Sequence, residues 1–182
     1  MNSLIKHISR IRDEFDTVIC GVNGVFTDGQ KVFPESVDTL TKLYQSGKKI
    51  ALASNSGLRV QNLFWHLKRC GMPMNIFYAL ITAGEIAHYY FKRQKNAGST
   101  YYSLVSENCC ALNELDYEKV DSVLMADFLV AEQSEKGAEI AELMPILEQA
   151  AGLNLPLLCI GNDTSVLTPQ AVKTAAGAVA EQ

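Results

Sequence analysis

Residues 15–98 alternate between short apolar runs and amphipathic stretches that end at a glycine, and this alternation constrains the fold most. The apolar runs, which favour strands, are "FDTVICGV", "KIALASN" and "NIFYALITAG". The stretches with helical spacing are "PESVDTLTKLYQSGKK", "SGLRVQNLFWHLKRCG" and "GEIAHYYFKRQKNAG". Strands that alternate with helices predict an α/β fold with a parallel, Rossmann-like sheet and right-handed crossovers.

The remaining segments are less regular. Residues 1–15 place Leu4, Ile5, Ile8, Ile11 and Phe15 at helical spacing, which predicts an amphipathic helix. In the second half, "STYYSLVS", "VDSVLMAD" and "LPLLCIGN" are predicted strands. The stretch "EKGAEIAELMPILEQAAG" is a predicted helix, kinked or restarted at Pro145, and another helix is predicted to begin at Pro169. We therefore divide the chain into a core portion, 1–98, and a smaller α/β module, 99–182.

Composition excludes two classes of partner. The 182 residues carry 16 Lys and Arg against 20 Asp and Glu, a net charge of -4. A mildly acidic chain without a basic run predicts no binding of nucleic acid or of anionic membranes. No apolar stretch approaches the roughly 20 residues of a membrane span, and charges interrupt any secretory signal at the N-terminus. These features predict a cytoplasmic protein.

Five cysteines are present, an odd number, and none has CxxC spacing. Without a secretory signal, buried free thiols are expected. The adjacent pair Cys109 and Cys110 has two interpretations: a redox or metal element, or loop cysteines without a special role. The histidines His7, His66 and His88 fall on separate predicted helices without ligand spacing. Packing or surface roles are therefore expected for them, and packing roles for Trp65 and the aromatic cluster 89–91.

Ligands of parallel sheets bind beyond the carboxyl ends of the strands, which here lie at 20–24, 53–56 and 82–84. The stretches around these ends, "FDTVICGVNGVFTDG", "FPESVDTLTKL", "KIALASNSG" and "LITAGEIA", resemble the haloacid dehalogenase-like superfamily. The closest similarity is to its class IIA branch, which includes sugar-phosphate and nucleotide phosphatases. The resemblance covers about the first 90 residues well and continues more weakly to "LLCIGNDTSVL". It implies a Rossmann-like core of which this chain holds the first half, with a cap-like module.

The resemblance also assigns site residues. It places the nucleophilic, magnesium-binding aspartate at Gly21 and the acid/base aspartate at Asn23, with Gly24 and Val25 matching the family pattern. The phosphate-holding serine matches Ser54. The family's lysine and acidic pair, which follow the cap, have no counterpart, and "IGND" at 160–163 matches the segment that returns from cap to core.

Chemistry argues in the same direction. Glycine offers no nucleophile, Mg²⁺ prefers carboxylate and water oxygens, and the amide of Asn23 exchanges no proton near neutral pH. We therefore predict no catalytic residue, no metal site and no cofactor. The alternative is a Mg²⁺-dependent phosphatase of small phosphorylated metabolites that uses a different nucleophile. Asp16 lies at the far end of the strand, and the expected role of Asp28 is in the turn before Gly29.

Two expectations concern binding. Ser54 and Asn55 either cap the following helix or hold a phosphate at its N-terminus, with Gly24 as a third contact. Without the two carboxylates, a phosphate or small phosphorylated ligand could bind this loop without metal. A sheet of three βα units also leaves an edge and part of a face uncovered, which predicts a homo-oligomer or completion by another chain.

Overall fold

The computed structural model describes residues 7–94, 98–105, 109–132, 140–167 and 172–181. By the density of contacts within them, these residues form two compact units. Unit 1 comprises Met1–Ala53 and Phe64–Leu80, and unit 2 comprises Ser54–Leu63 and Ile81–Gln182. Each unit is described separately below. No helix in the described ranges is long and apolar enough to cross a membrane.

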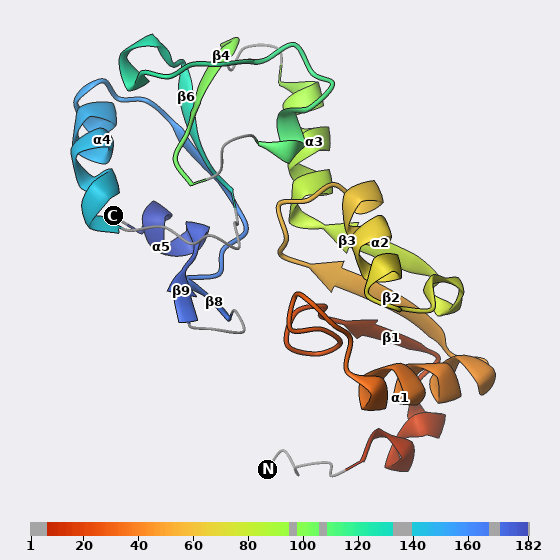
Figure 1. The fold of residues 1–182 in the computed structure, drawn as a ribbon. Helices are drawn as coiled ribbons and strands as arrows, with labels where there is room; N and C mark the ends of the chain where they lie inside the picture. Colours follow the sequence, from red (N-terminus) through yellow and green to blue (C-terminus); the bar gives the residue numbers. More distant parts are fainter. Residues whose placement is uncertain (1–6, 95–97, 106–108, 133–139, 168–171, 182) are drawn as a thin grey trace. The chain divides into compact units, whose positions relative to one another are not determined.

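Unit 1 is built around a three-stranded sheet with the order β1-β2-β3. Its strands are β1 (Thr17–Cys20), β2 (Lys49–Ser54) and β3 (Ala79–Thr82), and β1 and β2 run parallel with Cys20 opposite Leu52 (Figure 1). The helices are α1 (Pro34–Gln45), α2 (Val60–Arg69) and the 3-10 helix η3 (Met74–Ile76). The predicted order of strands and helices in this half is confirmed.

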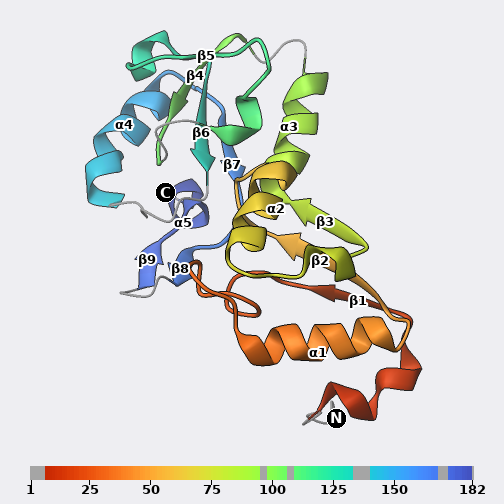
Figure 2. The same ribbon diagram turned by 45° about the vertical axis from the view of Figure 1, so that its right-hand side comes forward.

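One face of this sheet forms the core of the unit. Ile50 and Leu52 of β2 are fully buried, and Leu40 and Leu43 of α1 are buried as well. Pro34 occupies the first turn of α1, and Gly47 follows its end with φ +83, a conformation that favours glycine. Figure 2 shows α1 alongside the edge strand β1.

The opposite face of the sheet is open. Ile19 of β1 is 74% exposed, although its strand was predicted to be buried. The reason is the period of two along a strand: Val18 and Cys20 point inward, so Ile19 points outward, where none of the described helices of unit 1 covers the sheet. The predicted N-terminal amphipathic helix is also wrong in its described part, which forms the short 3-10 helices η1 (Ile8–Arg10) and η2 (Arg12–Glu14) with no buried residue.

Unit 2 contains a four-stranded sheet with the order β5-β4-β6-β7, in which all neighbouring strands run parallel. Its strands are β4 (Thr100–Ser103), β5 (Glu118–Lys119), β6 (Phe128–Glu132) and β7 (Leu157–Ile160). Its helices are α3 (Ala83–Arg93), α4 (Ile140–Gly152), α5 (Ala176–Ala180), and the 3-10 helices η4 (Cys110–Leu112) and η5 (Val123–Met125). A hairpin of β8 (Ser165–Leu167) and β9 (Val172–Thr174) follows β7.

Two predictions for this half are wrong. The stretch "VDSVLMAD" forms η5, because the Ser122 hydroxyl accepts a hydrogen bond from the Leu124 amide and starts a helical turn. The strand follows it as β6, whose five residues are all buried. The helix expected from Pro169 is replaced, in its described part, by β9 and then the short α5. Val172 and Thr174 are β-branched and pair with β8.

Candidate functional site

The loop after β1 is shaped by its own hydrogen bonds and by two buried side chains. Val22 and Phe26 are each 2% exposed, and the Phe26 amide donates to the Val22 carbonyl oxygen at 3.0 Å. The Gly24 amide donates to the Thr27 carbonyl oxygen at 2.8 Å. Gly21 directly precedes Val22 and Asn23 directly follows it, and both are exposed. The loop therefore turns back on itself with positions 21 and 23 facing solvent.

Gly21 is not a glycine that the backbone requires. A Cβ atom built there would meet only the Val25 Cγ2 atom, at an ordinary contact distance of 3.6 Å, and the residue lies outside the left-handed region. Gly24 differs, because its φ is +75. A Cβ atom at position 21 would therefore fit, so the fold does not require glycine there. The amide of Gly24, a predicted phosphate contact, is already used within the loop.

The two aspartates considered as replacements lie elsewhere or are already engaged. Asp28 Oδ1 accepts hydrogen bonds from the amides of Gln30 at 3.0 Å and Lys31 at 2.9 Å, which confirms its predicted turn role. These backbone hydrogen bonds lower the pKa of the Asp28 carboxyl below its ordinary value, which makes it a weak base. Asp16 precedes β1 at its opposite end, with Oδ1 3.9 Å from Lys48 Nζ.

Ser54 ends β2 and begins a pair of serine turns. Its hydroxyl oxygen accepts from the Ser56 amide at 3.2 Å, and the hydroxyl oxygen of Ser56 accepts from the Leu58 amide at 3.2 Å. The Asn55 Nδ2 atom donates to Asp163 Oδ1 at 2.9 Å. Neither Ser54 nor Asn55 caps α2, which begins only at Val60, so the capping interpretation is wrong. The two serine turns form most of the segment between the end of β2 and the start of α2.

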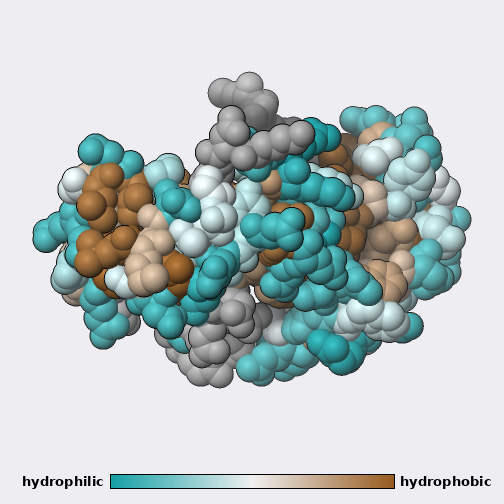
Figure 3. Space-filling view, turned by 90° about the horizontal axis from the view of Figure 1, so that it is seen from above, coloured by the Kyte–Doolittle hydropathy of each residue, from teal (hydrophilic) through white to brown (hydrophobic). Residues whose placement is uncertain are grey.

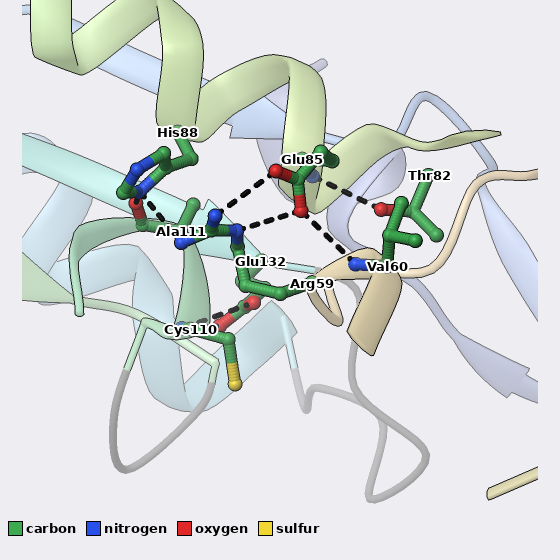
Figure 4. Close-up of polar contacts among 8 residues, drawn as sticks. All are labelled: Arg59, Val60, Thr82, Glu85, His88, Cys110, Ala111 and Glu132. Atoms are coloured by element: carbon green, nitrogen blue, oxygen red, sulfur yellow. Dashed lines mark hydrogen bonds and ion pairs between the residues drawn. The ribbon is translucent and has the colours of Figure 1, made fainter. Parts of the chain in front are cut away.

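A carboxylate satisfies the start of α2 instead (Figure 4). Glu85 Oε2 accepts from the Val60 amide at 3.1 Å, and Glu85 receives two further bonds, from Arg59 Nε at 2.8 Å and from Arg59 Nη2 at 2.9 Å. The hydrogen bonds from Arg59 are the main cause that lowers the pKa of Glu85. The N-terminus of α2, a position that attracts anions, is therefore occupied by the chain's own carboxylate.

Sequence reasoning missed this cluster, although one signal was present. Thr82 and Glu85 have the spacing of a capping box, and the Thr82 hydroxyl does accept from the Glu85 amide at 3.0 Å. The Glu85 side chain, however, reaches across to Arg59 rather than back to Thr82. A partner 26 residues away has no local sequence signature.

His88 adjoins the same cluster and is buried (Figure 4). Its Nδ1 atom lies 2.8 Å from Arg59 Nη1 and 2.9 Å from the Ala111 carbonyl oxygen. The arginine can only donate and the carbonyl can only accept, so a given tautomer of the ring serves one of the two contacts. This arrangement fits the packing role predicted for His88, within a polar network.

The cysteine pair lies beside a buried carboxylate. Glu132 is 3% exposed and accepts from the Cys110 amide at 3.2 Å. Burial, and then the charge of Glu132, raises the pKa of the Cys109 thiol to about 12. All five cysteines are free thiols, but only Cys109 is buried, so the expected burial holds for one of them. No group of three or more metal-ligating side chains occurs in the described part of the chain.

The chain matches the sequence model of a known family over residues 18–118, more than half of its length. The description of that family is haloacid dehalogenase-like hydrolase. No curated protein matched the chain in a sequence search.

Solved structures share its fold. A haloacid dehalogenase-like hydrolase from Brucella suis 1330 aligns with a TM-score of 0.86 at 20% identity, over 98% of this chain and 65% of the other. The p-nitrophenyl phosphatase from Archaeoglobus fulgidus aligns with a TM-score of 0.64 at 21% identity, over 90% and 61%. NagD from E. coli K-12 aligns with a TM-score of 0.59 at 20% identity, over 91% and 63%. The chain thus spans less than two thirds of each of these structures.

Proposed function

The chain belongs to the family of haloacid dehalogenase-like hydrolases, and from that premise we propose that it binds a phosphorylated small molecule without hydrolysing it. The observation that carries this proposal is the pair Gly21 and Asn23 at the end of β1, where the family's catalytic aspartates are expected. Both residues face solvent, so the positions themselves are accessible to a ligand.

The chemistry of the loop supports the absence of turnover. Covalent phosphoryl transfer needs an oxygen nucleophile in line with phosphorus, and position 21 offers only a backbone. A magnesium ion that neutralises the transferred group needs carboxylate oxygens, and the one carboxylate between Gly21 and Phe33 is Asp28. Asp28 already accepts two backbone hydrogen bonds. Nucleophile, metal ligand and proton donor are therefore missing together.

Binding is proposed at Ser54 and Asn55. The Ser54 oxygen accepts a hydrogen bond from the Ser56 amide, which fixes the oxygen and leaves the hydroxyl proton to donate to an anion. Asn55 is exposed, and its side-chain amide adds a second donor group. Gly24, the third contact predicted from the sequence, is not part of this proposal, because its amide already donates to the Thr27 carbonyl oxygen. We further propose that 1–98 corresponds to the core portion and 99–182 to a cap-like module, and the cytoplasmic location stays a prediction.

The test compares turnover and binding in the same preparation. With p-nitrophenyl phosphate and Mg²⁺, the wild-type chain is expected to release no p-nitrophenol above the rate of a heat-denatured sample. Titration with inorganic phosphate is expected to shift the amide resonances of Ser54 and Asn55, and Ser54→Ala should weaken this response several-fold. Metal-dependent turnover that is abolished by Asp28→Asn would instead establish the alternative, a phosphatase with a different nucleophile.

A further inference from the structure

The segment Ser54–Arg59 is packed against the rest of unit 2 at three points. The Gly84 amide donates to the Ser56 carbonyl oxygen at 3.1 Å. Gly57 lies so close to Glu132 that a Cβ atom there would come within 2.2 Å of Glu132 Cγ. Asn55 bonds to Asp163. Asn55, one of the two residues proposed to bind phosphate, therefore has a neighbour within its own unit, and that neighbour is the carboxylate of Asp163.

The backbone of Asp163 is held in place independently of its side chain. Its carbonyl oxygen accepts from the Gly177 amide at 2.9 Å. A Cβ atom at Gly177 would lie 2.5 Å from the Asn162 carbonyl oxygen, so α5 packs tightly against this turn. Gly161, with φ +97, lets the chain turn directly after β7. The side chain of Asp163 is exposed, so it is available to a ligand.

The charge of Asp163 has a consequence for any anion at Asn55. A phosphate that accepts a hydrogen bond from Asn55 Nδ2 would approach a carboxylate oxygen that itself lies 2.9 Å from that nitrogen. Two negative groups at such a separation repel each other, even near the surface. A ligand that carries its own positive charge beside the phosphate would replace this repulsion with an attraction, because the cation would pair with Asp163.

We propose that Asp163 determines the specificity of the Ser54–Asn55 site, which takes phosphate monoesters that carry an ammonium group a few bonds from the phosphate. This inference rests on the proposed function, since it names the ligand class of the same site. In it, Ser54 and Asn55 hold the phosphate and Asp163 holds the ammonium group. A ligand of the same shape without the charge is bound more weakly.

The experiment uses two ligands that differ by one group. O-phosphoethanolamine carries an ammonium group where propyl phosphate carries a methyl group. Calorimetric titration of the full chain, in the presence of EDTA, is expected to give at least about fivefold tighter binding of phosphoethanolamine. In Asp163→Asn this preference should fall to about onefold, with tighter binding of propyl phosphate. Glu118→Gln, which removes an exposed carboxylate on β5, is the matched control and should keep the preference.

Asparagine at position 163 keeps a side-chain oxygen that can accept from Asn55, so the contact itself is retained. A thermal melt checks each variant, and Asp163→Ala replaces Asp163→Asn if the latter unfolds. Equal binding of the two ligands by the wild type, or a preference unchanged in the variant, would overturn the inference and leave the proposed function intact. No binding of either ligand, or binding unaffected by Ser54→Ala, would overturn both.

Discussion

Gly21 and Asn23 stand at the two positions where the catalytic aspartates of a haloacid dehalogenase-like hydrolase are expected. The loop that carries them keeps its internal hydrogen bonds and its two buried anchors, Val22 and Phe26. A Cβ atom at position 21 would meet only Val25 Cγ2, at 3.6 Å, so the loop conformation does not require glycine there. The shape of the loop and the chemistry of its side chains are therefore separate properties.

A first prediction concerns the reactivity of Cys109. Its pKa of about 12, raised by burial and the charge of Glu132, leaves almost no thiolate at pH 8.5. Iodoacetamide at this pH should leave Cys109 unlabelled in the folded chain and label it after denaturation, as peptide mass spectrometry would show. Labelling of Cys109 in the folded chain at the rate of a solvent-exposed model thiol would contradict the structure.

The same thiol makes stability depend on alkaline pH. A group whose pKa is raised in the folded state contributes stability below its unfolded pKa, here about 9, and this contribution is lost as the pH rises toward 12. Urea unfolding at intervals between pH 8 and 11 should show this loss, and Cys109→Ala should reduce its slope. An identical slope in the variant would assign the loss to other groups.

The pair of Arg59 and Glu85 connects the start of α2 to the first turn of α3. Glu85→Gln should lower the free energy of unfolding by about 1–3 kcal/mol, because three hydrogen bonds to a charged, partly buried group are weakened. The lowered pKa of Glu85 contributes stability above its unfolded pKa, near 4.5, which disappears as the pH falls through the folded value. The variant should therefore lose part of the acid dependence between pH 5 and 3.

Asp38→Asn is the matched control for this pair. Asp38 forms an exposed pair with Lys42 four residues along α1, and such pairs contribute about 0.3–0.5 kcal/mol. Equal losses of stability in the two variants, measured by urea unfolding at pH 7, would show that the partly buried hydrogen bonds of Glu85 add no extra stabilisation.

At the level of the elements, the contact between the turn at Gly57 and the start of α3 leaves no room for a side chain at Gly84. A Cβ atom at Gly84 would lie 1.8 Å from the Gly57 carbonyl oxygen, a backbone atom that cannot rotate away. Gly84→Ala should therefore destabilise the chain by about 1–3 kcal/mol or more. Gly152→Ala, at the end of α4 with nothing within 4 Å, should be neutral. A neutral Gly84→Ala in the thermal melt would show that this contact is looser.

The sequence predicted the elements of unit 1 well because its helices end at glycines and its strands are short apolar runs. Gly47 and Gly71 both adopt the positive φ expected after a helix. Prediction failed where a side chain decided a local turn, as at Ser122, and where pairing outweighed helix signals, as at Val172. The same holds for the candidate site. The turn role of Asp28 could be predicted from the residues next to it in the sequence. The hydrogen bond of Asn55 to Asp163 could not, because it joins residues 108 positions apart.

At the scale of the whole molecule, exposed apolar surface is the main feature to explain. In unit 1, the edge strand β1 exposes Ile19. Brown surface gathers at the left of Figure 3. In unit 2, Leu124 and Met125 of η5 are 64% and 68% exposed, and Leu153, which follows α4, is 47% exposed. Surfaces of this kind are typical of interaction sites.

We predict self-association through the open face and edge of β1, in line with the oligomer expected from the sequence. Ile19→Lys should place a charge on this edge and reduce the associated fraction, measured by light scattering at micromolar concentration. Leu124→Lys, at the second apolar region, is the control and should leave the fraction unchanged. A wild-type monomer at these concentrations, or dissociation by Leu124→Lys alone, would contradict the prediction.

Intact-mass spectrometry tests whether the tip of β1 can carry a phosphoryl group, which we expect it cannot. The full chain is incubated with acetyl phosphate and Mg²⁺, quenched in acid and weighed, with a haloacid dehalogenase-like phosphatase that retains both aspartates treated in parallel. We expect a phosphoryl adduct on the reference enzyme and an unchanged mass for this chain. A phosphoryl adduct on this chain, mapped to any residue between Gly21 and Gly29, would contradict it.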